Sequence, residues 1–141
     1  MNSGFDVFTP TYNRAYCIKN VYDSLLQQTY KDFTWVVIDD GSQDDTKNLI
    51  DKFARESKIN IIYHWQENHG RFAAFNTAKQ FFQHELVATV DSDDWLLPDG
   101  LEKLYKCWNR LENKNKYSGI VAHFETQDGK LLGSEFPREG G

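Results

Sequence analysis

The stretch VATVDSDDWLLPDGLEKL, residues 87–104, passes from an apolar strand through an acidic turn into a helix. Its apolar start belongs to a strand that we expect over residues 86–90 and that stops at Asp91. Pro98 suits the first turn of the following helix, because the N–H that proline lacks would be unpaired there. The stretch therefore predicts a buried strand whose carboxyl end carries polar side chains.

The same order of strand, polar turn and helix recurs towards the N-terminus. Short apolar runs predict strands at 5–8, 35–38, 60–65 and 86–90, with short later strands at 120–122 and 130–132. Apolar residues at helical spacing predict helices over 18–25, 46–53, 71–83 and 101–111, the second beginning with a capping box of Ser42 and Asp45. This alternation predicts an α/β fold with three α/β/α layers around a mostly parallel, Rossmann-like sheet.

The composition is that of a globular domain without the marks of a nucleic-acid-binding protein. The 141 residues suit one domain, with 21 acidic against 16 basic side chains and a net charge of -5. No run rich in Lys or Arg is present, so no nucleic-acid partner is predicted. The N-terminus does not resemble a secretion signal, and no apolar run approaches the ~20 residues of a membrane span. We therefore expect a cytoplasmic protein.

Polar clusters follow three of the predicted strands. Residues 9–14 (TPTYNR) come after the first strand, Asp39 and Asp40 after the second, and residues 91–94 (DSDD) after the fourth. The carboxyl ends of parallel strands meet at one edge of the sheet, where such sheets bind their ligands. Three clusters on that edge predict a binding site more strongly than any one of them.

The acidic turn, residues 91–94, has the composition of a metal site. Asp91 and Asp93 can direct two carboxylates into one place, and like charges held close together favour a cation that relieves them. Carboxylate oxygens are hard ligands, which suit Mg²⁺ or Mn²⁺ better than softer metals. The alternative is a solvated turn that caps the next helix, because Asp is common in turns. The strand before the turn and the segment WLLPD after it favour the metal.

Each of the other clusters also has two interpretations. Asp39 and Asp40 could accept N–H groups from a nucleobase or hydroxyls from a ribose, or they could cap a helix. Residues 9–14 could form the wall of a nucleotide site beside a helix N-terminus, or an ordinary turn with surface polar groups. Arg71, after a glycine, could neutralise a phosphate.

Four segments, taken in order, resemble the inverting glycosyltransferases of family 2, which have the GT-A fold. The segments are TPTYNR at 9–14, LLQQTYKDFTWVVIDDGSQDDT at 25–46, ENHGRFAAFNTA at 67–78 and the opening stretch at 87–104. No single segment is specific to the family, but the four segments occur in the family's order and together span nearly the whole chain. The resemblance implies a nucleotide-diphospho-sugar transferase fold, with residues 1–141 as a single donor-binding domain, truncated from a longer protein.

The resemblance also implies a role for each matching residue. Asp93 matches the direct metal ligand and Asp91 its partner, whereas Asp94 is an adjacent carboxylate of unassigned role. Asp40 matches the residue that reads the nucleobase, Asp39 is its neighbour, and Arg71 matches a basic position near the donor. The other residues expected to bind the nucleotide sugar are Thr9, Tyr12, Asn13, Arg14 and Ser92.

The chemistry implied is metal-dependent transfer of a sugar from a nucleoside-diphosphate sugar of the UDP or GDP type. Mn²⁺ or Mg²⁺ would act as a Lewis acid on the leaving diphosphate, while a saccharide or lipid-linked acceptor hydroxyl attacks with the help of a general base. We expect that base to lie outside this chain, together with any segment that associates with the membrane surface. The family resemblance suggests cell-envelope, capsule or exopolysaccharide synthesis.

Two alternatives compete with this interpretation. A non-catalytic nucleotide-sugar-binding module would use the same clusters to bind the donor without transferring the sugar. A phosphatase with a DxD nucleophile motif would place that motif after an early strand, whereas here it follows the fourth. Titration with nucleoside diphosphates in the presence and absence of metal separates these alternatives.

Overall fold

A computed structural model describes residues 2–114, 124–125 and 131–132. The chain forms two compact units, residues 1–105 and 106–141. In the second unit β5 (Phe124–Glu125) and β6 (Leu131–Leu132) pair antiparallel. The strand β6 falls within the strand expected at 130–132, whereas the strand expected at 120–122 lies outside the described residues.

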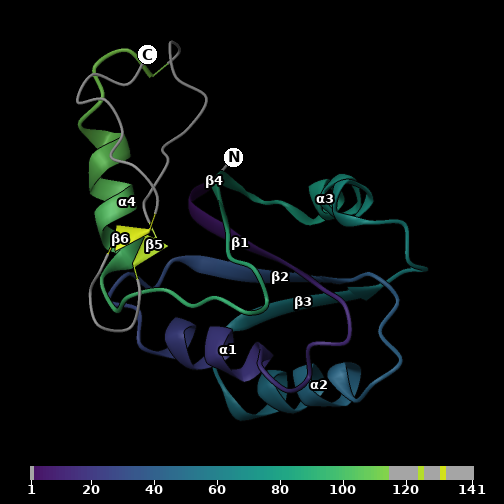
Figure 1. The fold of residues 1–141 in the computed structure, drawn as a ribbon. Coiled ribbons are helices and arrows are strands. Elements are labelled where there is room, and N and C mark those ends of the chain that lie inside the picture. The colour runs from purple at the N-terminus through teal and green to yellow at the C-terminus, as the bar shows by residue number, and fades with distance from the viewer. Residues whose placement is uncertain (1, 115–123, 126–130, 133–141) are drawn as a thin grey trace. The chain divides into compact units, whose positions relative to one another are not determined.

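The first unit is built on a parallel sheet of four strands, shown in Figure 1. The strands lie in the order β3-β2-β1-β4, with bounds β1 Asn2–Thr11, β2 Phe33–Asp39, β3 Asn60–Trp65 and β4 His84–Thr89. From β1 to β3 the chain steps outward in one direction, and it then returns to place β4 on the other side of β1. The strand order therefore reverses between the carboxyl ends of β1 and β4, which is where sheets of this kind bind ligands.

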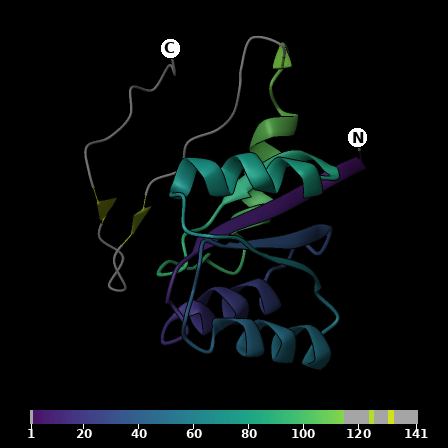
Figure 2. The same ribbon diagram turned by 90° about the vertical axis from the view of Figure 1, so that its right-hand side faces the viewer.

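The helices follow from this strand order. Right-handed crossovers that step in opposite directions place their helices on opposite faces of a sheet. Accordingly α1 (Ile18–Leu26) and α2 (Thr46–Glu56) cover one face and α3 (Arg71–Ala78) covers the other, as Figure 2 shows. A fourth helix, α4 (Gly100–Asn109), follows the acidic turn. The three-layer arrangement expected from the sequence is confirmed.

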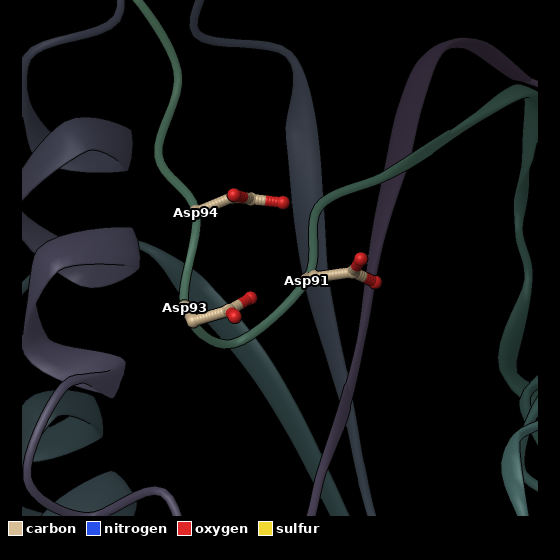
Figure 3. A group of neighbouring side chains, drawn as sticks. All are labelled: Asp91, Asp93 and Asp94. Carbon is tan, nitrogen blue, oxygen red and sulfur yellow. The ribbon is translucent and has the colours of Figure 1, made fainter. Parts of the chain in front are cut away.

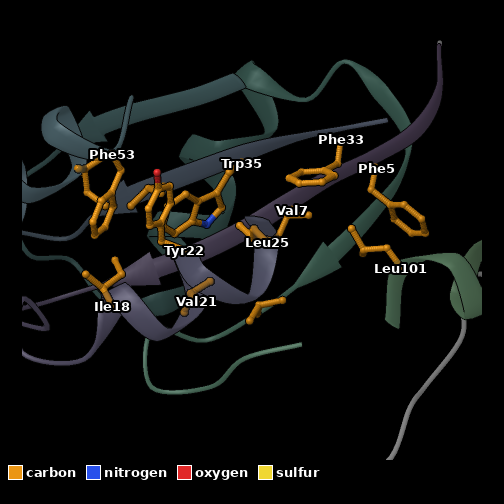
Figure 4. Close-up of a cluster of buried hydrophobic side chains, with 13 residues drawn as sticks. Phe5, Val7, Ile18, Val21, Tyr22, Leu25, Phe33, Trp35, Phe53 and Leu101 are labelled. Atoms are coloured by element: carbon orange, nitrogen blue, oxygen red, sulfur yellow. The ribbon is translucent and has the colours of Figure 1, made fainter. Parts of the chain in front are cut away.

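The larger hydrophobic core lies between the sheet and the helices α1 and α2 (Figure 4). The rings of Tyr22 and Phe53 stack with centroids 4.0 Å apart, which joins the two helices above Trp35 of β2. Leu101 of α4 is fully buried in the same cluster, so the residues after the acidic turn are anchored in the core. A smaller cluster covers the α3 face and consists of Phe8, Val36, Ile38, Ala74 and Ala78.

The structure corrects three local predictions. The first strand runs to Thr11, beyond the predicted 5–8, because β2 pairs with it as far as Asp39. The helix expected over 71–83 ends at Ala78 and continues as a 3-10 turn over 79–81. The capping box is wrong, because Asp44 accepts the Thr46 N–H at 3.1 Å while the Ser42 hydroxyl accepts an N–H from the loop after β1.

Two further sequence features have simple counterparts in the structure. The two cysteines, Cys17 and Cys107, are free thiols. Within the described residues, the helices are all too short or too polar to cross a membrane.

Candidate donor and metal site

Three carboxylates converge in the acidic turn that follows β4. One oxygen each of Asp91, Asp93 and Asp94 lies within 4.8 Å of the other two, and Figure 3 shows the three side chains. The Asp94 N–H donates to the Asp91 carbonyl at 3.0 Å, which bends the backbone so that all three carboxylates belong to one turn. Burial raises the pKa of Asp94, and the charges of Asp93 and Asp91 raise it further. The ionised group is therefore one that a cation would stabilise.

Arg71 of α3 brings a positive charge to this turn. Its Nη2 lies 2.6 Å from Oδ1 of Asp91 in an ion pair whose side chains are 60% and 32% exposed. The charge of Arg71 also opposes the rise in the pKa of Asp94. The sequence placed Arg71 at a basic position near the donor, and that role stays a prediction; the structure places its guanidinium beside the acidic turn.

The segment after β1 lies against the loop that follows β2. Asn13, at a φ of 52°, donates its N–H to the Ser42 hydroxyl at 2.8 Å and accepts the Gln43 N–H at 2.8 Å. Tyr12 is half exposed beside it. The guanidinium of Arg14 donates to the Tyr16 hydroxyl, which raises the Arg14 pKa, and the charge of Asp93 raises it further. Asn13 thus joins two strand ends, and Arg14 lies within electrostatic range of the acidic turn.

Thr9 is not brought to this edge. Its side chain is fully buried, and its hydroxyl accepts the indole N–H of Trp35 at 2.9 Å inside the core. The prediction that placed Thr9 among the nucleotide contacts assumed that the strand ends before it. Because β1 continues to Thr11, the Thr9 side chain points into the layer beneath α1 and α2 instead.

The two carboxylates at the carboxyl end of β2 both accept hydrogen bonds from the protein. Asp39, which is 0% exposed, accepts the Ser42 N–H at 2.8 Å and the hydroxyl proton of Tyr63. Asp40, which is 7% exposed, accepts the N–H groups of His69 at 3.0 Å and Gly70 at 2.8 Å. It also accepts the side-chain amide of Gln66 at 3.0 Å. Burial opposes the ionisation of Asp40, but these three hydrogen bonds outweigh it and lower its pKa.

Asp40 therefore fixes the segment that leads into α3 and to Arg71. Gly41 makes the approach feasible, because its φ of +97° suits glycine and a Cβ there would lie 3.0 Å from the backbone nitrogen of Asn68. Residues 66–71 therefore link Asp40 to the acidic turn, because they bind Asp40 at one end and pair with Asp91 through Arg71 at the other.

Comparison with known proteins assigns the chain to a family. The sequence pattern described as "Glycosyl transferase family 2" matches residues 6–139. The chain belongs to glycosyltransferase family 2.

Two curated relatives illustrate this membership. Glycosyltransferase GlyA of Streptococcus pneumoniae is 40% identical over 100 residues, which cover 71% of this family-2 chain and 14% of GlyA. The putative teichuronic acid biosynthesis glycosyltransferase TuaG of Bacillus subtilis is 34% identical over 127 residues, covering 89% of the chain and 49% of TuaG. The family-2 chain thus spans less than half the length of either relative.

Solved structures of similar proteins have the same fold. Staphylococcus aureus TarS residues 1–349, in complex with UDP-GlcNAc, is 30% identical with a TM-score of 0.70 over 77% of this chain and 31% of that one. The mannosyltransferase PcManGT of Pyrobaculum calidifontis, in complex with GDP-Man and Mn²⁺, is 27% identical with a TM-score of 0.64 over 68% of this chain and 29% of that one. The GT-A fold expected from the sequence is confirmed.

Two supports of the acidic turn in the family-2 chain were not predicted from the sequence. The Cys17 thiol donates to the carbonyl of Ser92 at 3.4 Å, which ties the start of α1 to the middle of the turn. The buried amide of Gln28 donates to the Leu97 carbonyl at 2.7 Å and accepts the Leu101 N–H at 3.1 Å. Ser92 was predicted to bind the nucleotide sugar, but its side chain is buried and is not on the surface. Neither Cys17 nor Gln28 belongs to a residue pattern that signals a site, so only the structure reveals them.

Proposed function

We propose that residues 1–141 are the donor-binding domain of a metal-dependent glycosyltransferase that transfers a sugar from a nucleoside-diphosphate sugar to an acceptor hydroxyl. The observation that carries the proposal is the convergence of three carboxylates where the strand order reverses between β1 and β4. Family membership supports sugar transfer, and the position of the acidic turn supports a role for a cation in it.

The residues of the acidic turn fit a divalent cation of the Mg²⁺ or Mn²⁺ type. Their oxygens are hard ligands, and the like charges of Asp91, Asp93 and Asp94 favour a bound cation. Asp93 is exposed and is the proposed direct ligand, with Asp91 as its partner and Asp94 beside them. A metal held there would stabilise the charge that develops on the leaving diphosphate. The Mn²⁺ bound to PcManGT supports this choice of metals.

The nucleotide would lie along the edge formed by residues 12–14 and the acidic turn. Tyr12 offers an exposed ring and Arg14 a cation, while Asn13 keeps the segment against the loop after β2. Asp40 remains the proposed reader of the nucleobase in preference to Asp39, which has no exposed surface. The bound UDP-GlcNAc of TarS and GDP-Man of PcManGT support a UDP or GDP donor.

For the acceptor we propose a saccharide or lipid-linked saccharide of a cell-envelope polymer. The support is the name of TuaG, a putative teichuronic acid biosynthesis enzyme, which this chain matches over 89% of its own length.

Calorimetric titration with UDP and with GDP, in the presence and absence of Mn²⁺, tests the proposal. We expect one of the two nucleotides to bind at least about tenfold more tightly with the metal, a gain of about 1.4 kcal/mol. Equal affinities with and without Mn²⁺ for both nucleotides would overturn metal-dependent donor binding. Repeating the titration with Mg²⁺ decides between the two metals.

A further inference from the structure

Arg71 occupies a position that is electrostatically unfavourable for its own helix. It is the first residue of α3, and the first turn of this helix contains no acidic residue. The N-terminus of a helix carries a partial positive charge, so a cation there is destabilising unless an anion is close by. The helix start and the guanidinium together form a region that attracts negative charge.

In this structure the anion close to Arg71 is Asp91. The 2.6 Å contact joins Nη2 of Arg71 to Oδ1 of Asp91, and among the described residues this oxygen is buried and accepts no hydrogen bond. In Figure 3 the carboxylates of Asp93 and Asp94 point across the turn towards Asp91, whose own carboxylate points to the far side. Arg71 therefore holds one oxygen of Asp91, which is one of the three carboxylates that converge in the acidic turn.

A metal ion and a guanidinium compete for the same carboxylate. Both are cations, and the Coulomb repulsion between them is strong when one partly buried group holds both. Arg71 is free to leave, because its side chain is 60% exposed, and the preceding Gly70 has no atoms within 4 Å of the place where a Cβ would lie. A diphosphate bound to the metal would offer Arg71 a new anion in the same region, and arginine pairs readily with phosphate oxygens.

We propose that Arg71 exchanges partners during donor binding, from Asp91 in the metal-free protein to the diphosphate in the metal-bound protein. This exchange rests on the proposed metal-dependent binding of a nucleoside diphosphate. In the metal-free protein Arg71 neutralises the charge of Asp91, as the metal would. It therefore opposes metal binding until a diphosphate binds. The consequence is coupling: the nucleotide removes the competitor of the metal, and the metal frees the arginine for the nucleotide.

The exchange predicts effects of opposite sign for Arg71→Gln. Mn²⁺ alone, measured by the loss of the electron paramagnetic resonance signal of free Mn²⁺, should bind about two- to fivefold more tightly, the range expected for release of a partly exposed ion pair. UDP or GDP at saturating Mn²⁺ should bind about tenfold more weakly, because a charge-assisted contact to phosphate is lost. Arg71→Lys keeps the charge and should stay within about twofold of wild type for Mn²⁺ alone.

Arg55→Gln provides the matched control, since Arg55 is an exposed arginine in the last turn of α2 and should change neither affinity. The exchange is overturned if Arg71→Gln shifts both affinities in the same direction or leaves either unchanged. A wild-type protein that binds nucleotide without any help from Mn²⁺ would overturn the proposed function as well, so the two failures are distinguishable.

If Arg71→Gln does not fold, a measurement on the wild-type protein still tests the exchange. The Nε–Hε resonance of Arg71, followed by NMR, should move when Mg²⁺ alone is added and move again when the nucleotide follows. The resonance of Arg55 should stay in place throughout. The exchange is overturned if the Arg71 resonance does not move when Mg²⁺ is added.

Discussion

Two acidic segments of this family-2 chain have similar sequences and opposite environments. Asp39 is the last residue of β2 and Asp40 follows it, whereas Asp91, Asp93 and Asp94 follow β4. The first pair is almost completely buried and accepts hydrogen bonds from backbone N–H groups, an amide and a phenol. The second group is more exposed, and its only direct cationic contact among the described residues is Arg71.

The difference shows that the number of hydrogen-bond donors around a carboxylate decides whether it stabilises the fold or is suited to binding a cation. A carboxylate with three N–H donors is stabilised as an anion and supports the fold, which is why the pKa of Asp40 is lowered. A carboxylate beside two others lacks such donors and is destabilised as an anion, which is why the pKa of Asp94 is raised. The donors around the first segment come from the protein itself, and the second segment is suited to binding a cation.

The largest expected effect is on stability. Asp40→Ala should lower the free energy of unfolding by about 3 kcal/mol, because it leaves the N–H groups of His69 and Gly70 without their acceptor. Asp94→Ala should leave stability unchanged or slightly higher, because it removes like-charge repulsion. Urea unfolding of the two variants measures the contrast. Equal losses would mean that the two segments do not differ in the way described.

Next in size is the effect on metal binding. Asp93→Asn should weaken Mn²⁺ binding at least about a hundredfold, because changes merely to the partners of metal ligands cost about 10- to 100-fold. Asp23→Asn, an exposed carboxylate paired with Lys19 on the surface of α1, is the control and should leave Mn²⁺ binding intact. Calorimetry with Mn²⁺ measures both variants. Retention of metal binding by Asp93→Asn would reject Asp93 as the ligand.

A smaller effect is expected at the phenol that contacts Asp39. Burial raises the pKa of Tyr63 well above its usual range, and the hydrogen bond to Asp39 raises it further. Tyr63→Phe removes this donor and should cost about 1 kcal/mol of unfolding free energy, without changing Mn²⁺ affinity. Denaturant unfolding and the metal titration check the two parts. A change in metal affinity would show that the two segments are coupled.

The smallest effect is the dependence of stability on pH. The lowered pKa of Asp40 means that its stabilising contribution is complete above its unfolded value of about 3.9 and is lost as the pH falls through the folded value. The raised pKa of Asp94 has the opposite sign: its ionisation weakens the fold as the pH rises from about 3.9 through the folded value. Asp94→Asn should therefore flatten the unfolding free energy in the pH range just above about 3.9, where Asp40 contributes no slope. An unchanged curve would contradict the raised pKa.

Some elements could be predicted from the sequence because their signals are local. Apolar runs and helical spacing located the four strands of the sheet and the helices that join them, and the start of α3 at Arg71 was correct. The end of β1 was not, because the ladder with β2 extends the strand through Thr9 and Pro10 to Thr11. Pro10 is tolerated in a central strand because its place lies beyond Phe8, the last residue that pairs with β4.

The sequence alone determined the class of fold and the edge of the sheet at which the polar clusters gather. Both follow from the alternation of strands and helices, because parallel strands bring their carboxyl ends to one side. Only the tertiary structure decided which acidic segment supports the fold and which is suited to binding a cation. That difference depends on N–H donors and on Arg71, which reach the carboxylates from distant parts of the chain, and residue type and spacing do not encode these contacts.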